Sequence, residues 1–470
     1  MKNLSRRSFL KNAVRGGVGL AVLPDLMPAR LLGADAPGKK IQVAQIGCGR
    51  MGRSDLGNVL NESLARVVAV CDLDSHRLAA GKKMAENYYA IRGGTGVNVK
   101  AFHDYHEVLT SPDIDAVVIT VPDHSHARLA IEAAIAGKHI YIQKPVTYSI
   151  AEAIGLRQAV EARKVILQTG SQQRSERPWG SFRKASEAVR NGRIGQLQTI
   201  KIGIGLDAPS GHPPAPMPVP ENLDYEHWLG SAPEQPYMER RVHSQRYLEG
   251  RPGWITTEDF GLGMITNWGA HHVDIAHSAM GQELGGPLTV DAHAEFMQHD
   301  VWTVHTTYHV EMVYPKNVQL ILDNKFENGL RFEGDEGWVF CTRGEEQATA
   351  SDPTTPAGRE ALRPLRASDA KILSPLGGDA VRWMPSRTHH GNWLESIAAN
   401  RQPIAPIQQS ARSLEACAAA WISMKLNRKL AWDAATERFA GDDAANALRR
   451  RPARKPEYDF ELALKQAGIA

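Results

Sequence analysis

The feature that most constrains this chain is a glycine-rich turn between an apolar run and a helical segment. Residues 41–46, IQVAQI, are followed by GCGRMG, in which Gly47, Gly49 and Gly52 stand in Gly-x-Gly-x-x-Gly spacing. The first glycine allows a tight turn, the second lets a phosphate approach the backbone, and the third lets helix and strand pack closely. Free N–H groups at the start of the following helix favour bound phosphate, so the turn predicts a dinucleotide site.

An acidic residue at the end of the next apolar run indicates which dinucleotide. The run ARVVAVC ends at Asp72, which lies 20 residues after Gly52. A carboxylate at this position bonds the ribose 2′-hydroxyl and repels a 2′-phosphate. The pattern therefore favours NAD over NADP.

Strand-like and helix-like segments alternate from about residue 40 to 170, which predicts a doubly wound parallel sheet of the Rossmann type. Such sheets bind ligands at the carboxyl ends of their strands, where this chain carries Pro122-Asp123, Lys144-Pro145 and Gln172-Gln173. The predicted cofactor-binding residues are Gly47, Cys48, Gly49, Arg50, Met51, Gly52, Asp72, Pro122, Asp123, His126, Gln143 and Lys144.

The pattern changes after residue 170. Alternating runs such as LTVDAHAEFM and TVHTTYHVEMVY, without helices between them, predict an open, mainly antiparallel sheet in an α+β domain over residues 171–430. The fold class is thus α/β, with an N-terminal Rossmann domain and a C-terminal α+β domain. We expect residues 431–470 to form a C-terminal arm whose basic cluster, Arg449–Lys455, is solvated.

The first 36 residues have the character of a targeting signal. SRRSFLK at residues 5–11 places two arginines before a weakly apolar stretch, as in a twin-arginine export signal. This segment has a net charge of +4 in a chain of net charge +3, which leaves 3 − 4 = −1 for the rest. A near-neutral body does not favour nucleic-acid binding. No other segment has about 18 consecutive apolar residues, so we expect a periplasmic protein that is not integral to a membrane.

Four segments together resemble the Gfo/Idh/MocA family of glucose–fructose oxidoreductases and inositol dehydrogenases. They are GCGRMG, CDLD, VPDHSHARLAIEAAIAGKHIYIQKP and TNWGAHHVDIAH, and the resemblance spans about residues 40–430. It implies NAD-linked hydride transfer on a small carbohydrate-type substrate, and a homo-oligomer, a dimer or tetramer, formed through the second sheet. The family's Glu-Lys-Pro motif is Gln143-Lys144-Pro145 here, and its Asp-x-Gly-x-His motif matches Asn267, Gly269 and His271.

The resemblance makes Lys144 and His271 the predicted catalytic residues. Lysine would polarise the substrate oxygen, and histidine would take the hydroxyl proton. Asn267 can orient an imidazole but cannot stabilise an imidazolium as an aspartate does. His272 and His277 do not share a helix face with His271, so the cluster lacks the three ligands of a zinc site, and no metal is expected.

A long proline- and aromatic-rich loop, residues 207–260, offers flat faces that suit a sugar ring. Its aromatic side chains could equally pin the loop to its own domain. His389 and His390 are candidates for the pocket edge. The predicted substrate-binding residues are Gln172, Gln173, Tyr225, Trp228, Tyr237, His243, Asn267 and His271.

These features predict an exported NAD-dependent oxidoreductase that acts on a secondary alcohol of a sugar, cyclitol or glycoside. Because the periplasm maintains no NAD pool, the cofactor must load before export through the twin-arginine machinery and remain tightly bound. Two alternatives stay open: a glycoside hydrolase or lyase that works by transient oxidation and elimination, and a non-catalytic NAD-stabilised binding protein.

Overall fold

The first sheet is parallel and has six strands. The computed structural model describes residues 40–93, 97–212, 214–281, 285–344 and 363–469, so the predicted export signal at residues 1–36 lies outside the described residues. The strand order is β3-β2-β1-β4-β5-β6, and every pairing is parallel, as predicted. The strands are β1 (Ile41–Ile46), β2 (Ala65–Cys71), β3 (Lys100–Phe102), β4 (Ala116–Ile119), β5 (His139–Ile142) and β6 (Leu167–Thr169).

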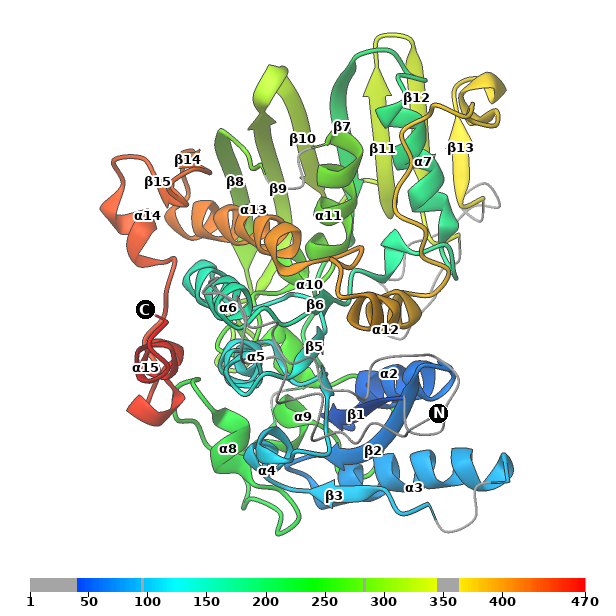
Figure 1. Ribbon diagram of the computed structural model, residues 1–470. Helices are drawn as coiled ribbons and strands as arrows, with labels where there is room; N and C mark the ends of the chain where they lie inside the picture. The colour runs from blue at the N-terminus through cyan, green and yellow to red at the C-terminus, as the bar shows by residue number, and fades with distance from the viewer. Residues whose placement is uncertain (1–39, 94–96, 213, 282–284, 345–362, 470) are drawn as a thin grey trace, which may run out of the picture. The chain divides into compact units, whose positions relative to one another are not determined.

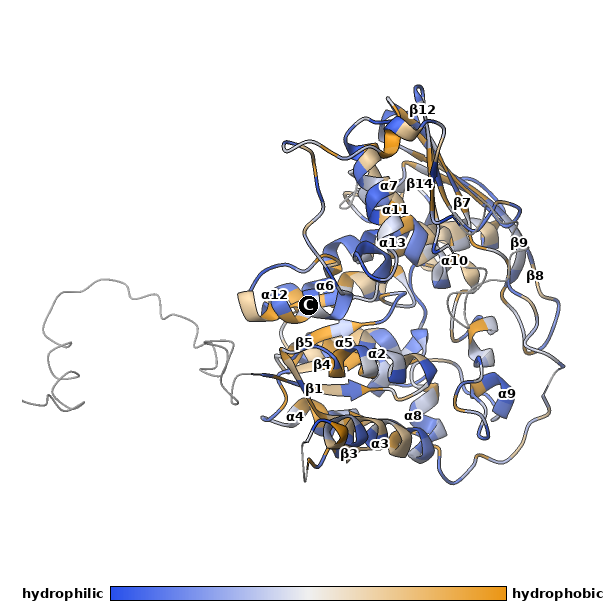
Figure 2. Ribbon diagram, turned by 90° about the vertical axis from the view of Figure 1, so that its right-hand side faces the viewer, coloured by the Kyte–Doolittle hydropathy of each residue, from blue (hydrophilic) through white to orange (hydrophobic). Residues whose placement is uncertain are grey.

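Helices follow these strands because local signals start them. The Asp74 side chain accepts hydrogen bonds from the first N–H groups of α3, and Ser149 and Glu152 form a capping box at the start of α6. Figure 2 shows the apolar central strands between these helices. The helices are α2 (Arg50–Leu60), α3 (Ser75–Ile91), α4 (Tyr105–Thr110), α5 (His126–Ile135) and α6 (Ile150–Arg163), with the short helix η2 (Asp123–Ser125) before α5.

The second sheet has nine strands in the order β13-β12-β11-β7-β10-β9-β8-β14-β15. Among the described strands of this second sheet only β7 and β10 pair in parallel, so the prediction of a mainly antiparallel sheet is confirmed. The strands are β7 (Leu197–Gly203), β8 (Thr289–Phe296), β9 (His305–Tyr314), β10 (Val318–Asp323), β11 (Gly329–Gly334), β12 (Gly337–Cys341), β13 (Leu365–Ala367), β14 (Leu430–Asp433) and β15 (Arg438–Phe439).

Three helices cover one face of this sheet: α7 (Gly180–Arg190), α11 (Gly269–Met280) and α13 (Ile407–Leu426) (Figure 1). A buried ion pair joins α11 to the segment before α7, because Arg174 Nε lies 2.6 Å from Asp274 Oδ2. The other short elements are η3 (Gln172–Arg174), α8 (Tyr225–Leu229), α9 (Glu239–Val242), η4 (Gly253–Thr256), α10 (Met264–Asn267), η5 (Pro315–Asn317), η6 (Ala370–Leu373), α12 (His389–Ala399), α14 (Asp443–Ala447), η7 (Pro456–Tyr458) and α15 (Phe460–Gln466).

The C-terminal segment is packed, so the prediction of a solvated arm is wrong. Phe460 and Leu464 of α15 belong to the apolar core of the first sheet and its helices. The basic cluster also has partners: the Arg451 guanidinium lies 3.8 Å from the centre of the Tyr148 ring, and Arg454 donates to the Gly230 carbonyl. Among the described helices, none is both long and apolar enough to cross a bilayer.

Candidate active site

The glycine-rich turn has the geometry of a phosphate cradle. Gly47 has a positive φ of 87°, and a Cβ there would lie 2.1 Å from the Thr120 carbonyl oxygen. A Cβ at Gly52 would lie 1.9 Å from the Gly47 oxygen, whereas a Cβ at Gly49 would meet nothing within 4 Å. The helix that starts here, α2, has no side-chain cap and no acidic residue in its first turn. Open space before an uncapped helix N-terminus fits a pyrophosphate.

Asp72 lies beside this turn at the end of β2. One of its carboxylate oxygens accepts a hydrogen bond from the Cys48 backbone N–H at 2.6 Å, and the other accepts from the Asp74 N–H at 2.8 Å. Burial raises the pKa of Asp72 above its ordinary value, and these hydrogen bonds oppose the rise. The Cys48 side chain is buried, so only its backbone faces the turn, while Arg50 and Met51 are half-buried at the start of α2.

A loop from the second half of the chain closes over this end of the first sheet. We call residues 222–249 the clamp loop. Its His243 Nε2 lies 2.9 Å from Asp74 Oδ2, and its Ser244 carbonyl accepts from Arg77 at 2.9 Å. Arg53 of α2 donates to the Leu248 carbonyl at 3.2 Å and forms an ion pair with Glu249. His243 thus lies near Asp72, at the predicted ribose end of the dinucleotide site, and its role in substrate binding stays a prediction.

The predicted catalytic residues meet at the same carboxyl edge of the sheet, beyond β5. Lys144 follows β5, and its Nζ donates to Asn267 Oδ1 at 3.2 Å across the two domains. An amide oxygen accepts this bond without neutralising the ammonium charge, as the family's aspartate would. His271 lies one turn further, at the start of α11, and its Nδ1 has no hydrogen-bond partner among the described residues.

Two titratable groups near Lys144 have shifted pKa values. Burial lowers the pKa of His271 well below its ordinary value, and the charges of Lys144 and Arg343 lower it further. The imidazole is therefore neutral at pH 7 and can accept a proton. Burial raises the pKa of Asp123 to about 7, although Lys144 opposes the rise. A Cβ at Gly261 would lie 3.2 Å from Asp123 Oδ2 and 3.4 Å from the Trp254 ring, so these groups share one small space.

A buried carboxylate that the sequence did not indicate explains the glutamine in the Gln-Lys-Pro motif. Gln143 Nε2 donates to both oxygens of Asp55, at 3.1 and 2.9 Å. Asp55 is fully buried in α2 and also accepts from Thr120 at 2.9 Å and lies 3.1 Å from His390 Nε2. A glutamate at position 143 would place two carboxylates in contact, so the amide suits this network. His390 belongs to the network rather than to an open pocket edge.

Several predicted ligand residues support the site through contacts with other protein groups. The ring nitrogens of His126 lie 2.7 and 3.0 Å from the carbonyl oxygens of Pro145 and Val121, so this side chain holds two strand-end turns together. Pro122 precedes η2 in the second of these turns. Gln172 donates to Asp55 at 3.4 Å. Gln173 is buried beneath α11, next to His272, and is not part of an open substrate surface.

The aromatic residues of the clamp loop do not form the open sugar platform that the sequence suggested. Tyr225, Trp228 and Tyr237 are only 8%, 6% and 2% exposed. Their rings contact one another and Phe260, with centroid distances from 5.0 to 5.7 Å. Because these faces are already covered, the rings anchor the clamp loop. The alternative reading, that they pin the loop, agrees with the structure.

The remaining histidines have structural partners. His272 and His277 are buried, and His277 Nε2 lies 2.7 Å from the Tyr314 hydroxyl. His389 lies 2.9 Å from the Ser175 hydroxyl. Asp274 pairs with Arg174 rather than with His271. The described part of the chain contains no cluster of three or more residues suited to hold a metal ion.

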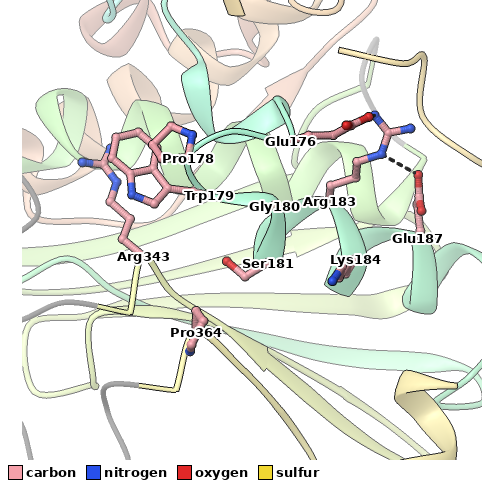
Figure 3. A pocket seen from close by; sticks show the side chains of 10 residues that line it. All are labelled: Glu176, Pro178, Trp179, Gly180, Ser181, Arg183, Lys184, Glu187, Arg343 and Pro364. Carbon is pink, nitrogen blue, oxygen red and sulfur yellow. Dashed lines mark hydrogen bonds and ion pairs between the residues drawn. The ribbon is translucent and has the colours of Figure 1, made fainter. Parts of the chain in front are cut away.

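A cavity of about 550 Å³ opens at the start of α7, the helix that packs beside α11 (Figure 3). Its lining includes Glu176, Trp179, Ser181, Arg183, Lys184 and Arg343. The Arg343 guanidinium lies between two indoles, 3.9 Å from the centre of the Trp179 ring and 4.3 Å from that of Trp268. Trp268 in turn contacts the His271 ring edge to face, so a chain of side-chain contacts joins the cavity wall to the predicted base. No sequence pattern indicated this cavity.

Comparison with known proteins agrees with this geometry. Residues 41–171 match the description "Oxidoreductase family, NAD-binding Rossmann fold", and residues 211–346 match "Oxidoreductase family, C-terminal alpha/beta domain". The chain belongs to the Gfo/Idh/MocA family. Its first domain is an NAD-binding Rossmann domain, and the glycine cradle and Asp72 are the features that fit the pyrophosphate and a ribose.

Three proteins illustrate what the chain is similar to. An uncharacterised oxidoreductase, YrbE, of Bacillus subtilis is 26% identical over 67% of this chain and 76% of its own length. The myo-inositol 2-dehydrogenase of Thermotoga maritima is 30% identical over 45% of this chain and 55% of its own length. The crystal structure of the WlbA dehydrogenase from Bordetella pertussis, in complex with NADH and UDP-GlcNAcA, has a TM-score of 0.58 at 16% identity and covers 84% of this chain and 99% of that one. That structure shares the fold.

Proposed function

We propose that the chain is an oxidoreductase that transfers hydride between a CH–OH carbon of a sugar, cyclitol or glycoside and NAD. One observation carries the proposal. The Lys144 ammonium is held by Asn267 at the carboxyl ends of the parallel strands, next to His271 in its neutral form. The similarity to an inositol dehydrogenase supports a polyhydroxylated substrate.

The chemistry follows from the side chains. NAD, when bound, supplies the acceptor for the hydride that leaves the carbinol carbon. Lys144 would donate a hydrogen bond to the hydroxyl oxygen and stabilise the alkoxide charge that develops there. His271 Nδ1, which lacks a partner among the described residues, would take the hydroxyl proton. Asn267 would hold the Lys144 side chain in place.

We further propose that NAD stays bound through many cycles and that the protein is exported. The clamp loop supports slow release, because His243, Ser244, Leu248 and Glu249 fasten it over the Asp72 end of the dinucleotide site. The twin-arginine pattern supports export in the folded state. A retained cofactor must be recycled in place, so each cycle would return the hydride to a second carbonyl or to the same substrate after elimination.

A homo-oligomer is also part of the proposal. The helices α7, α11 and α13 cover one face of the second sheet, and on β9 alternate residues such as Thr307 and Glu311 are exposed. This uncovered face is available to a second copy of the chain. Size-exclusion chromatography with light scattering would measure the mass directly, and a monomer at micromolar concentration would contradict this part.

The main test removes the Lys144 ammonium. Lys144→Ala should leave folding and bound NAD unchanged while hydride transfer falls by about 10²–10³. The assay follows the absorbance of reduced nicotinamide during a single turnover of the NAD-loaded protein with a panel of sugars and cyclitols, and Lys100→Ala, an exposed lysine on β3, is the control. Turnover within about tenfold of wild type would remove Lys144 from the mechanism. Cleaved product without net reduction would instead indicate the hydrolase or lyase reaction.

A further inference from the structure

The cavity at the start of α7 is joined to the active centre by physical contact. Arg343 forms part of its wall and stacks on Trp268, whose ring contacts His271. The charge of Arg343 also lowers the pKa of His271, which places the guanidinium within electrostatic reach of the imidazole. The cavity and the predicted catalytic residues therefore lie close together, on either side of Arg343 and Trp268.

The wall of the cavity carries more positively than negatively charged side chains. Arg183 is engaged by carboxylates, since its Nε lies 3.0 Å from Glu187 and its Nη1 lies 3.6 Å from Glu176, and it also donates to two backbone carbonyls. Figure 3 shows Arg183 and Glu187 facing each other. Lys184 and Arg343 are two further cations of the wall. The wall therefore carries three cations and two carboxylates.

Two more features favour an anion in this cavity. The first turn of α7, which lines the cavity with Gly180 and Ser181, contains no acidic residue, and its N-terminus has no side-chain cap. The N–H groups of this turn add partial positive charge to that of Lys184. The volume of about 550 Å³ is within the usual range for small-molecule sites.

We propose that this cavity is a subsite for an anionic group, a carboxylate or a phosphate, on the carbohydrate whose carbinol reaches Lys144 and His271. The inference rests on the proposed function and narrows its substrate class to acidic sugars or sugar phosphates. Lys184 and Arg343 are the specificity-determining cations. Arg343 additionally contacts Trp268, which precedes α11 and contacts His271.

The test compares neutral and anionic ligands on the NAD-loaded protein. Calorimetry would measure binding of methyl glucoside, methyl glucuronide and glucose 6-phosphate, so that the last two distinguish a carboxylate from a phosphate. We expect at least one anionic ligand to bind about tenfold more tightly than methyl glucoside, with an advantage that shrinks in high salt. Lys184→Glu should abolish this advantage, and Lys184→Arg should retain it.

Two controls distinguish a loss of the subsite from misfolding and from a general change of charge. Lys184 is exposed, so its variants should fold, and their melting temperatures would verify this. Lys325→Glu, an equal charge change at an exposed position between β10 and β11, should leave the preference unchanged. Equal affinities for neutral and anionic ligands, no binding of any of them, or a preference that survives Lys184→Glu would each overturn the subsite. The proposed function is judged separately, by nicotinamide reduction with both the neutral and the anionic carbohydrates: anion binding without hydride transfer from any of them would refute that function and leave anion binding in the cavity standing.

Discussion

The substitution Gln143→Glu tests whether the buried Asp55 carboxylate dictates the residue before Lys144. In the structure the Gln143 amide nitrogen lies 3.1 and 2.9 Å from the two Asp55 oxygens. A glutamate would replace this donor by a second carboxylate of nearly the same shape. Two charges about 3 Å apart repel by about 5 kcal/mol at an effective dielectric constant of about 20.

The variant can avoid this repulsion if one of the two carboxyl groups is protonated. Keeping a carboxyl with an ordinary pKa of about 4.3 protonated at pH 7 costs about 4 kcal/mol, and the protonated acid can donate to Asp55 as the amide does. The cost at pH 5 is only about 1 kcal/mol. Because the folded-state pKa is raised, the penalty is absent below the unfolded pKa and grows as pH rises toward the folded pKa. The free energy of unfolding should therefore fall by about 4 kcal/mol at pH 7 and by about 1 kcal/mol at pH 5.

Urea unfolding of wild type and Gln143→Glu at both pH values, with saturating NAD throughout, would measure this difference. The matched control is the double variant Asp55→Asn/Gln143→Glu, which exchanges amide and carboxylate and should recover more than half of the loss at pH 7. A loss that is the same at pH 5 and pH 7, or a double variant no more stable than the single one, would refute the electrostatic reasoning.

Three further predictions concern the cofactor, the base and the core. Asp72→Ala should weaken NAD binding about tenfold or more and reduce the preference of the protein for NAD over NADP. Titration of the apoprotein with NAD and with NADP would measure this preference, and an unchanged preference would mean that the ribose contact lies elsewhere. The pKa of His271 should lie well below about 6.5 and should rise in Lys144→Met, because a neighbouring cation is removed. NMR titration of the imidazole would measure the pKa in both proteins, and a lower pKa in the variant would contradict the prediction. Arg174→Met should destabilise the fold by about 3–5 kcal/mol by leaving Asp274 buried without its partner, and Asp274→Leu in the same chain should restore most of it, as measured by urea unfolding.

The first domain could be predicted well because its signals are local. The glycine spacing, the buried strands and the acid at residue 72 each depend on a few neighbouring residues, and the structure has the six-stranded parallel sheet that they imply. Lys144 and Asn267 could be brought together only through the family resemblance, and their hydrogen bond shows that the two motifs do meet.

The errors concern contacts between segments far apart in the sequence. The aromatic residues of the clamp loop were expected at a substrate surface, but their faces are covered by one another, which no periodicity reveals. Asp55 lies in the middle of an ordinary helix pattern, and its importance comes from Gln143 and His390, 88 and 335 positions away. The arginines near residue 451 look like a solvated basic run until the tyrosine and carbonyl groups they contact are placed.

The packing of α15 has a consequence for how the chain acquires its shape during synthesis. Arg128 of α5 donates to the Asp459 carbonyl, a contact that spans 331 positions, and the apolar side chains of α15 then pack against α5 and α6 as part of the first domain's core. A ribosome that has just made the first domain has not yet made the helix that completes its core. That domain therefore stays unfinished until translation has passed residue 466, and stable capture of its cofactor is an event that follows translation.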